Sequence, residues 1–328
     1  EVHFIIKTHQ DKLINLIMKN LKLNKTVTWA FPILMLALGC NPSRTDNKEQ
    51  KQPDLVIESD IRLGGFLPLL PLNNNIVDMM DRSVTIEDFD IPGFPKKMIT
   101  YGTVFAVMAE VTDEFVYEVA QSFHEMFPQD PDLDLEMQKK ILNNMLQYRS
   151  LIPVLNGRYE SLSDDMEGSM EQLSKDYSVC DIIMYRDGTG RQTMEVVEHL
   201  LHYLTSIGLH LTLPEDWSFS DPKSKVTQVM NQAIEAGLYD VGSYKDMIEE
   251  DKEVYQRVIV QEFSYWLIST YWDLQEPYGP MSEEEWNVDN KQDLLKKLPE
   301  GYDLVDQTVD RFMKSPSLEI LEKFRKYN

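Results

Sequence analysis

Residues 195–202 constrain the fold of this chain more than any other segment, because they place four ionisable side chains within an apolar stretch. The segment reads Glu-Val-Val-Glu-His-Leu-Leu-His. Each residue of a helix advances by about 100°, so Glu195, Glu198, His199 and His202 lie within an arc of roughly 100° on one face. The other four positions are apolar, which predicts a buried helix. Buried carboxylates and imidazoles need partners, and a metal ion can satisfy several of them together.

The spacing within this predicted helix is typical of a metal site. Glu198 and His202 stand four residues apart, which places two ligands on adjacent turns, as in zinc hydrolases. Three of the six histidines lie between residues 199 and 210. We expect the helix to end at Gly208 and His210 to support the site from just beyond that end. The alternative is an ordinary helix whose Glu and His side chains simply contact each other.

A second segment supplies a candidate third ligand. Residues 245–275 form the longest helical pattern, and Glu262, Tyr265 and Trp266 share one face of it. In zinc hydrolases with two ligands on one helix, a later helix often supplies the third, frequently a Glu. We therefore predict Glu262 as the third ligand, with Tyr265 and Trp266 surrounding the site. The alternative is a core helix in which Glu262 pairs with Arg257 or a lysine.

The first part of the chain has the features of an export signal. Met18 begins a basic segment, an apolar run over residues 27–38 follows, and Gly-Cys comes next, which predicts a signal peptide over residues 18–39. The run Leu-Ala-Leu-Gly-Cys resembles a bacterial lipobox, so Cys40 is expected to be lipidated. Residues 1–17 then read as a mis-assigned upstream extension, because Met18 already begins a complete signal. The alternative is a membrane-anchor helix.

These features predict a lipid-anchored protein of the bacterial cell envelope. Residues 40–53 are polar and without periodicity, which is typical of a flexible tether. Asn rather than Asp follows Cys40, which favours the outer membrane in a Gram-negative host, facing the periplasm or the cell surface. The expected partner is thus the membrane, through the lipid on Cys40. With Cys40 acylated, Cys180 has no cysteine partner for an intramolecular disulfide.

The charge balance argues against a nucleic-acid partner. The chain carries 55 acidic and 32 basic residues, a formal net charge of −23. Affinity for nucleic acid depends on neutralising phosphates with basic side chains. Such a chain is instead expected to be soluble outside the cell and to attract cations.

The remaining sequence predicts an α+β fold that is predominantly helical. Residues 54–97 are rich in Pro, Gly and Asn and read as an irregular segment, and residues 98–328 read as a single helix-rich domain. Strands are predicted over residues 98–107 and 179–185. Helices other than those described above are predicted over residues 113–127, 135–148, 161–175 and 222–236.

Three aspartates at 130, 132 and 134 superficially suggest a calcium loop. The required Gly at the sixth position is absent, and Ile141 stands where the loop needs a Glu. This segment is therefore predicted to be a solvated acidic loop.

Two segments of the chain resemble two helix motifs of an uncharacterised family of secreted bacterial proteins. Residues 198–205 read Glu-His-Leu-Leu-His-Tyr-Leu-Thr, and residues 261–269 read Gln-Glu-Phe-Ser-Tyr-Trp-Leu-Ile-Ser. The family has a Glu-Glu-x-x-His-x-Ile-Thr helix followed by a Thr-Glu-Tyr-x-Tyr-Trp-Ala-Leu-Thr helix, and the resemblance covers roughly residues 95–328. The resemblance implies a zincin-like helix core with a few short strands.

The chain departs from the usual zincin helix at the position of the base. With His202 as the last ligand, Glu198 occupies the first ligand position and His199 the position of the general base. We expect one divalent metal, zinc first, held by Glu198, His202 and Glu262. The candidate catalytic residues in a metal-dependent peptidase or esterase are His199, as the base, and Glu195, which could instead bind the metal or support its ligands.

Two other functions stay open. The first is a catalytically inactive lipoprotein that keeps the metal or binds a partner on the same scaffold. The second is a lipid-tethered periplasmic solute-binding protein, since residues 112–118 look somewhat like a helix of tripartite-transporter receptors.

Overall fold

The computed structural model describes residues 81–158, 164–279 and 285–328. Several predictions concern residues outside these ranges: the upstream extension (1–17), the signal peptide (18–39), the lipidated Cys40 with its tether (40–53), and the first part (54–80) of the irregular segment. In the described part of the chain, no helix is both long enough and apolar enough to cross a bilayer.

A five-stranded mixed sheet forms the β part of the fold, with the strands in sequence order. The first two pairs, β1–β2 and β2–β3, are antiparallel, whereas β3–β4 and β4–β5 are parallel. The strands are β1 Thr85–Ile91, β2 Phe94–Thr100, β3 Thr103–Val107, β4 Leu151–Asn156 and β5 Ile183–Tyr185.

The prediction of an irregular segment over residues 54–97 was wrong for its last part, because β1 and the start of β2 lie there. Acidic residues lower the β propensity of β1, and this hid the strand. Cross-strand pairing stabilises it instead: Glu87 lies opposite Lys97, and their charged groups are 3.4 Å apart.

The strand predicted over residues 98–107 is in fact a hairpin. Tyr101 and Gly102 form its turn, with φ of 47° and 72°. Positive φ at both central positions is characteristic of a type I′ turn, which usually carries Asn-Gly or Asp-Gly. The Tyr at the first position concealed the turn in the sequence.

The fold is α+β and predominantly helical, as predicted. The α-helices are α2 Asp113–Met126, α3 Leu135–Gln147, α4 Asp164–Asp176, α5 Gln192–Tyr203, α6 His210–Thr212, α7 Pro214–Trp217, α8 Lys225–Glu235, α9 Lys245–Glu250, α10 Lys252–Tyr271, α11 Gln275–Tyr278, α12 Lys291–Lys297, α13 Pro299–Gln307 and α14 Leu318–Lys323. A π-helix, η2 Leu204–Leu209, joins α5 to α6, and 3-10 turns occupy η3 Gly242–Tyr244, η4 Val309–Arg311 and η5 Phe324–Tyr327.

Side-chain caps fix where several helices begin. Thr112 accepts a hydrogen bond from the Phe115 N–H at the start of α2, and Asp134 caps α3 in the same way. Asp251 caps α10 and thereby separates it from α9. The predicted 245–275 helix is thus two helices.

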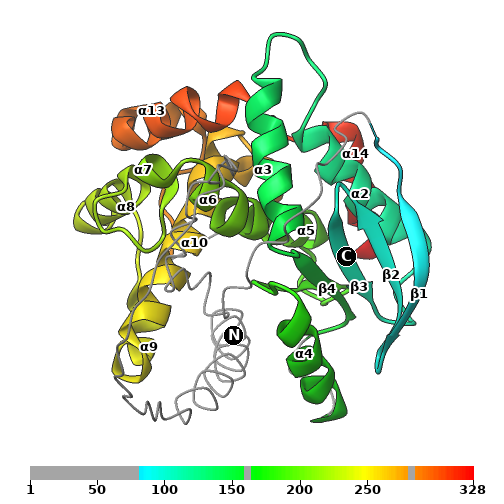
Figure 1. Cartoon of the computed structure of the whole chain (residues 1–328). Helices are drawn as coiled ribbons and strands as arrows, with labels where there is room; N and C mark the ends of the chain where they lie inside the picture. Colours follow the sequence, from blue (N-terminus) through cyan, green and yellow to red (C-terminus); the bar gives the residue numbers. More distant parts are fainter. Residues whose placement is uncertain (1–80, 159–163, 280–284) are drawn as a thin grey trace, which may run out of the picture.

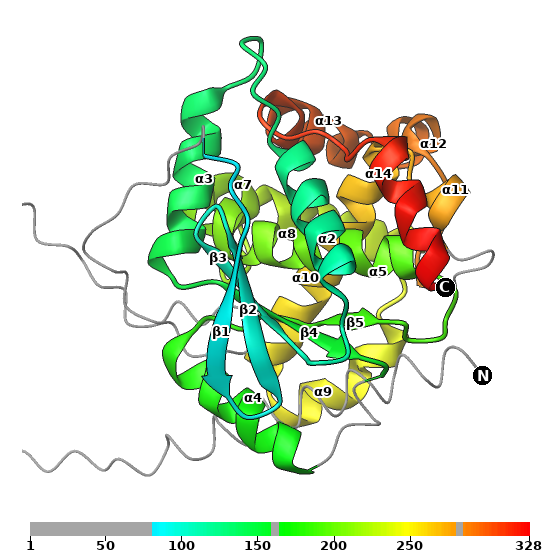
Figure 2. The same cartoon turned by 90° about the vertical axis from the view of Figure 1, so that its right-hand side faces the viewer.

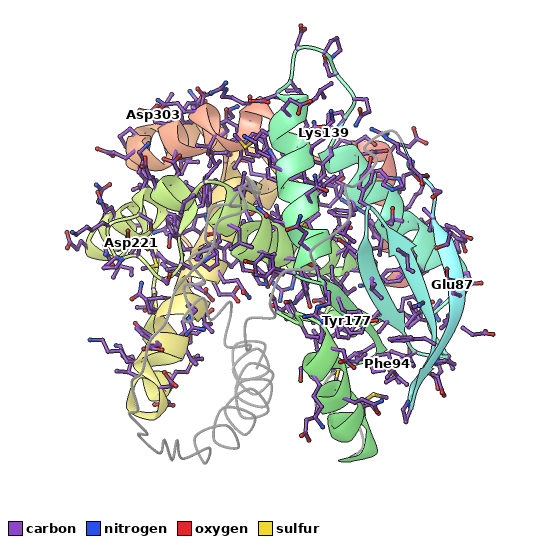
Figure 3. The ribbon with its side chains drawn as sticks, viewed as in Figure 1. Glu87, Phe94, Lys139, Tyr177, Asp221 and Asp303 are labelled. Carbon is purple, nitrogen blue, oxygen red and sulfur yellow. The ribbon has the colours of Figure 1, made fainter. Side chains whose placement is uncertain are left out.

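The sheet lies on one side of the molecule and α7, α8 and α10 lie on the other, with α3 and α5 between them (Figure 1). The main apolar core fills this space. A smaller core lies between α4 and the sheet, whose positions Figure 2 shows. Phe94 is buried in this core and Tyr177 packs against the core; both are labelled in Figure 3.

Helix α5 does not end at Gly208 as predicted. The chain continues through η2 into α6 without leaving the helical path. Gly208 serves a different purpose, because a Cβ there would lie only 2.7 Å from Cγ2 of Ile141 on α3. The missing side chain therefore allows α3 to approach the π-helix closely.

We expect Gly208→Ala to destabilise the protein by about 1–3 kcal/mol, because the added methyl overpacks the contact with Ile141. The matched control is Gly168→Ala in α4, where a Cβ meets nothing within 4 Å. The control should gain up to about 1 kcal/mol from helix propensity. Urea denaturation measures both, and equal effects of the two substitutions would contradict this account of Gly208.

Candidate metal-binding site

The candidate site lies where α5 packs against α10, close to the end of the loop that enters β5. Helix α5 is buried along almost its whole length, so its polar side chains face protein rather than water. Glu195 and His199 are buried, His202 is fully buried, and Glu198 is partly exposed. Glu262 reaches the cluster from α10 and is also buried.

The structure brings the three predicted metal ligands together. Glu198, His202 and Glu262 each offer one ligand atom, and these atoms lie within 4.8 Å of one another. Nε2 of His202 is 3.5 Å from Oε2 of Glu262. This nitrogen makes no hydrogen bond, although its side chain is wholly buried. Burying a polar atom without a hydrogen bond is costly, and the ion-pair contact with Glu262 offsets part of this cost.

Sequence reasoning missed one member of the cluster, Asp181. Its Oδ2 lies 2.6 Å from Nδ1 of His202, and its Oδ1 lies 3.5 Å from Nε2 of His199. Asp181, His199 and His202 form a second group whose ligand atoms lie within 4.8 Å of one another. The available signal was a carboxylate in the apolar run of residues 179–185, since such a residue must find a partner.

The two residues predicted to be catalytic, His199 and Glu195, also lie in the cluster. Nδ1 of His199 is 2.6 Å from the backbone oxygen of Glu195, one turn earlier on α5. Its Nε2 faces Asp181. The Glu195 carboxylate accepts a hydrogen bond of 2.7 Å from the Met184 N–H on β5. Glu195 and His199 therefore connect α5 to β5 and its loop.

Mutual electrostatics control the protonation of the cluster. Burial alone would lower the pKa of His199, but the carboxylates of Glu195, Asp181 and Glu198 raise it to about 9. Burial likewise opposes the charge on His202, yet Glu262 and Asp181 raise its pKa well above the usual value. These shifts favour the cationic form of both imidazoles in the metal-free protein.

The pKa values of the Glu198 and Asp181 carboxyl groups shift in opposite directions. Burial raises the pKa of Glu198 to about 7, with Glu262 and Glu195 adding to the effect and the histidines opposing it. Burial would also raise the pKa of Asp181, but His199 and His202 lower it to about 2. Asp181 is consequently ionised, and Glu198 holds a proton for part of the time near neutrality.

Two of the three predicted supporting residues lie beside the cluster. The Tyr265 ring meets the His202 ring edge-on, with centroids 6.0 Å apart, and Trp266 packs on Tyr265 at 4.7 Å. The Trp266 indole N–H donates to Glu285 at 3.1 Å. Arg257, the alternative partner considered for Glu262, forms an ion pair with Glu253 at 3.6 Å.

His210 has a separate environment. Its Nδ1 accepts a hydrogen bond of 2.9 Å from the Phe219 N–H, and its ring lies against the Phe219 ring. It belongs to neither of the two groups of candidate ligands found in the described residues. Burial, with a smaller effect of Arg257, lowers the pKa of His210 to about 4. His210 is a neutral packing histidine.

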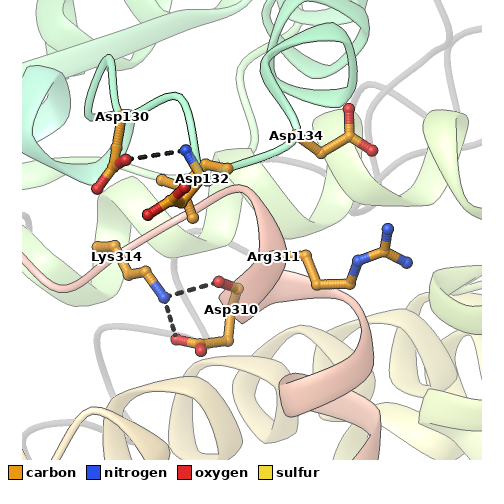
Figure 4. Close-up of a pocket in the computed structure, with 7 residues that line it drawn as sticks. Asp130, Asp132, Asp134, Asp310, Arg311 and Lys314 are labelled. Atoms are coloured by element: carbon orange, nitrogen blue, oxygen red, sulfur yellow. Dashed lines mark hydrogen bonds and ion pairs between the residues drawn. The ribbon is translucent and has the colours of Figure 1, made fainter.

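The acidic loop of residues 130–134 borders a surface pocket with Asp310, Arg311 and Lys314 (Figure 4). Asp130 and Asp132 are exposed, as predicted for a solvated loop. The carboxylate of Asp130 accepts from the Asp132 N–H, and that of Asp134 caps α3. The Lys314 ammonium lies 2.9 Å from the Asp310 carboxylate. Local hydrogen bonds and charge pairing thus account for several of these groups without a calcium ion.

Comparisons of the chain with protein-family models, with curated proteins and with solved structures found no match. The resemblance drawn from the two helix motifs therefore stays a prediction.

The low pKa of His210 predicts a loss of stability in mild acid. Its pKa of about 4 lies below the unfolded value of 6.5, so the unfolded chain binds the proton more readily. This contribution to stability is complete above pH 6.5 and falls as the pH drops toward 4, by up to about 3 kcal/mol.

We expect His210→Asn, which keeps an acceptor for the Phe219 N–H, to flatten this pH dependence relative to the parent protein. Urea denaturation at several pH values between 8 and 4.5 measures the difference. If the free energy of unfolding falls equally with pH in the two proteins, protonation of His210 is not the cause of the loss.

Proposed function

We propose that Glu198, His202 and Glu262 bind one divalent metal ion. The observation that carries this proposal is the buried Nε2 of His202, which makes no hydrogen bond and lies 3.5 Å from Oε2 of Glu262. Ligands held at about 2.0–2.1 Å in a tetrahedral site are roughly 3.4 Å apart. The observed separation therefore suits two ligands of one ion, and Glu198 offers a third donor within 4.8 Å.

The charge of the cluster also favours a cation. Asp181, Glu195, Glu198 and Glu262 contribute four carboxyl groups, against the two imidazoles of the cluster. Even with both imidazoles protonated, full ionisation gives these six side chains together a net charge of −2. Buried charge is expensive unless it is paired, and a divalent cation would pair with these carboxylates.

The donor set suits zinc or a harder divalent ion. Imidazole nitrogen and carboxylate oxygen are both ligands of catalytic zinc sites, which keep a further position for water or substrate. Manganese and magnesium prefer more oxygen ligands. Zinc is therefore our first candidate.

For the activity of this metal site, we propose a zincin-like, metal-dependent hydrolase of the peptidase or esterase type. A bound divalent ion polarises a carbonyl and lowers the pKa of a water molecule. In this chain Glu198 is the one partly exposed member of its group, so a substrate would reach the site past this side chain. The helix pattern shared by Glu198, His202 and Glu262 with zinc hydrolases supports this assignment.

A second candidate function is metal binding without catalysis. It is favoured by His199, the residue at the position of the general base. Its two ring nitrogens face the Glu195 backbone and Asp181, rather than the group formed by Glu198, His202 and Glu262. In either case, lipidation of Cys40 would hold the site at a membrane of the cell envelope.

We expect the purified protein to contain about one equivalent of zinc or a similar ion. Glu262→Gln and His202→Gln should each reduce the bound metal at least tenfold, because each removes a ligand while keeping a similar volume. Elemental analysis after dialysis measures the stoichiometry. His210→Asn is the matched control, since it alters a buried histidine outside the cluster, and it should leave the metal content unchanged.

Absence of metal from the parent protein after loading with zinc, manganese or cobalt would overturn the proposed site. Metal retained equally in all four proteins would place the ion elsewhere in the chain.

Turnover and metal content together separate the two candidate functions. If the protein is a hydrolase with His199 as its base, His199→Gln should lower kcat for a peptide or ester substrate by about 100-fold or more, with the metal retained. If the parent protein binds metal but hydrolyses none of a panel of peptides and esters, the binding function stands instead.

A further inference from the structure

We infer that Asp181 is a positioning residue, which orients His202 so that its Nε2 faces the metal. This inference rests on the proposed metal site and adds a residue that lies outside the three ligands. Asp181 comes from the loop before β5, whereas the ligands come from α5 and α10. It would act through His202 and would not itself touch the ion.

A continuous chain of alternating acids and imidazoles crosses the site. It begins at Glu195, whose carboxylate lies 3.4 Å from Nδ1 of His199. His199 contacts Asp181 at 3.5 Å, Asp181 contacts His202 at 2.6 Å, and His202 contacts Glu262 at 3.5 Å. The shortest of these contacts is the one between Asp181 and His202.

Asp181 is itself held from several sides. Its Oδ1 accepts a hydrogen bond of 2.8 Å from the Ile182 N–H and lies beside Nε2 of His199. Its Oδ2 accepts from His202 and also lies 3.3 Å from Nε2 of Gln261 on α10. The loop before β5, α5 and α10 therefore all fix this carboxylate, which leaves it little freedom to rotate.

This arrangement selects which nitrogen of His202 can bind an ion. The proton on Nδ1 points at Asp181, so Nε2 is the nitrogen with a free lone pair once His202 is neutral. Metal-binding histidines commonly donate their other N–H to a carboxylate in this way, which fixes the ring orientation. His202 belongs to both groups of candidate ligands. Because Asp181 occupies its Nδ1, His202 can bind an ion through Nε2, together with Glu198 and Glu262.

The test compares Asp181→Asn and Asp181→Ala with the parent protein. Removal of such an outer carboxylate weakens metal affinity by roughly 10- to 100-fold. We expect about tenfold for Asp181→Asn, which keeps one acceptor, and about 100-fold for Asp181→Ala. Competition with a chromophoric zinc chelator measures the affinity, and circular dichroism checks that each variant is folded.

The matched control is Asp187→Asn. Asp187 is as buried as Asp181, at 7% exposure against 6%, and its carboxylate accepts hydrogen bonds from Thr189. It lies outside the cluster, so we expect less than a twofold change in zinc affinity. If Asp187→Asn weakens zinc binding as much as Asp181→Asn does, the effect at Asp181 comes from the loss of a buried Asp that the fold needs. In that case Asp181 does not position His202.

A second readout does not require metal. In protein with 15N-labelled histidine, the His202 Nδ1 proton should appear as a slowly exchanging downfield signal, because it lies in a short buried hydrogen bond. The signal should persist in Asp187→Asn and disappear in Asp181→Ala. If the signal and the zinc affinity both survive in folded Asp181→Ala, Asp181 does not position His202.

The two readouts separate this inference from the metal site. If the parent protein binds no zinc, the proposed function fails. In that case, loss of the Nδ1 signal in Asp181→Ala would still show that Asp181 orients His202. If zinc binds and Asp181→Ala binds it equally well, the metal site stands and the positioning role is wrong.

Discussion

The hydrogen bond between His202 and Asp181 links the sheet of this fold to its central helix, α5. Asp181 belongs to the loop that enters β5, and His202 belongs to α5, in the middle of the molecule. Through the same ring, His202 faces Glu262 on α10, which packs on the far side of α5. The sheet, the central helix and the long helix are therefore joined by polar contacts at one point within the apolar core. Any change in their relative placement would separate these groups and leave buried charge unpaired, which is strongly unfavourable.

Such a cluster contributes little to stability by itself. Desolvation of buried ions can exceed their attraction, and apolar residues of similar volume often serve a fold equally well. In the metal-free protein the cluster depends on protonated histidines and on a Glu198 whose pKa is raised to about 7. A ligand that binds only the folded chain adds its binding free energy to stability. A metal ion at this point would act in that way, which gives the charged residues a physical reason to occupy the core.

Much of the fold and of the site followed from periodicity and spacing, whereas contacts between distant segments did not. The helical pattern of α5 predicted that Glu195, Glu198, His199 and His202 share a face, and the pattern of α10 pointed to Glu262. The structure brings Glu198, His202 and Glu262 within 4.8 Å of one another. Asp181 could not be paired from sequence, because its partner is 21 residues away and depends on how β5 meets α5. His210 was misplaced for a related reason: the helix was expected to end at Gly208, yet it continues as a π-helix. Strand β1 was missed because its stability comes from pairing with β2, not from local propensity.

The π-helix that follows His202 completes the support of the site. Ser206 Oγ donates to the His202 carbonyl at 2.5 Å, and Thr205 Oγ1 donates to the Leu201 carbonyl at 2.8 Å. These side chains hydrogen-bond carbonyls at the end of α5, where the wider π turn alters the regular bonding pattern. On its outer side, Gly208 allows α3 to pack against this turn. The backbone at His202 is thus held by η2 and α3, and its ring is held by Asp181 and α10. Rigid support of this kind is what a metal ligand requires, because an ion binds tightly only where its donors are already in place.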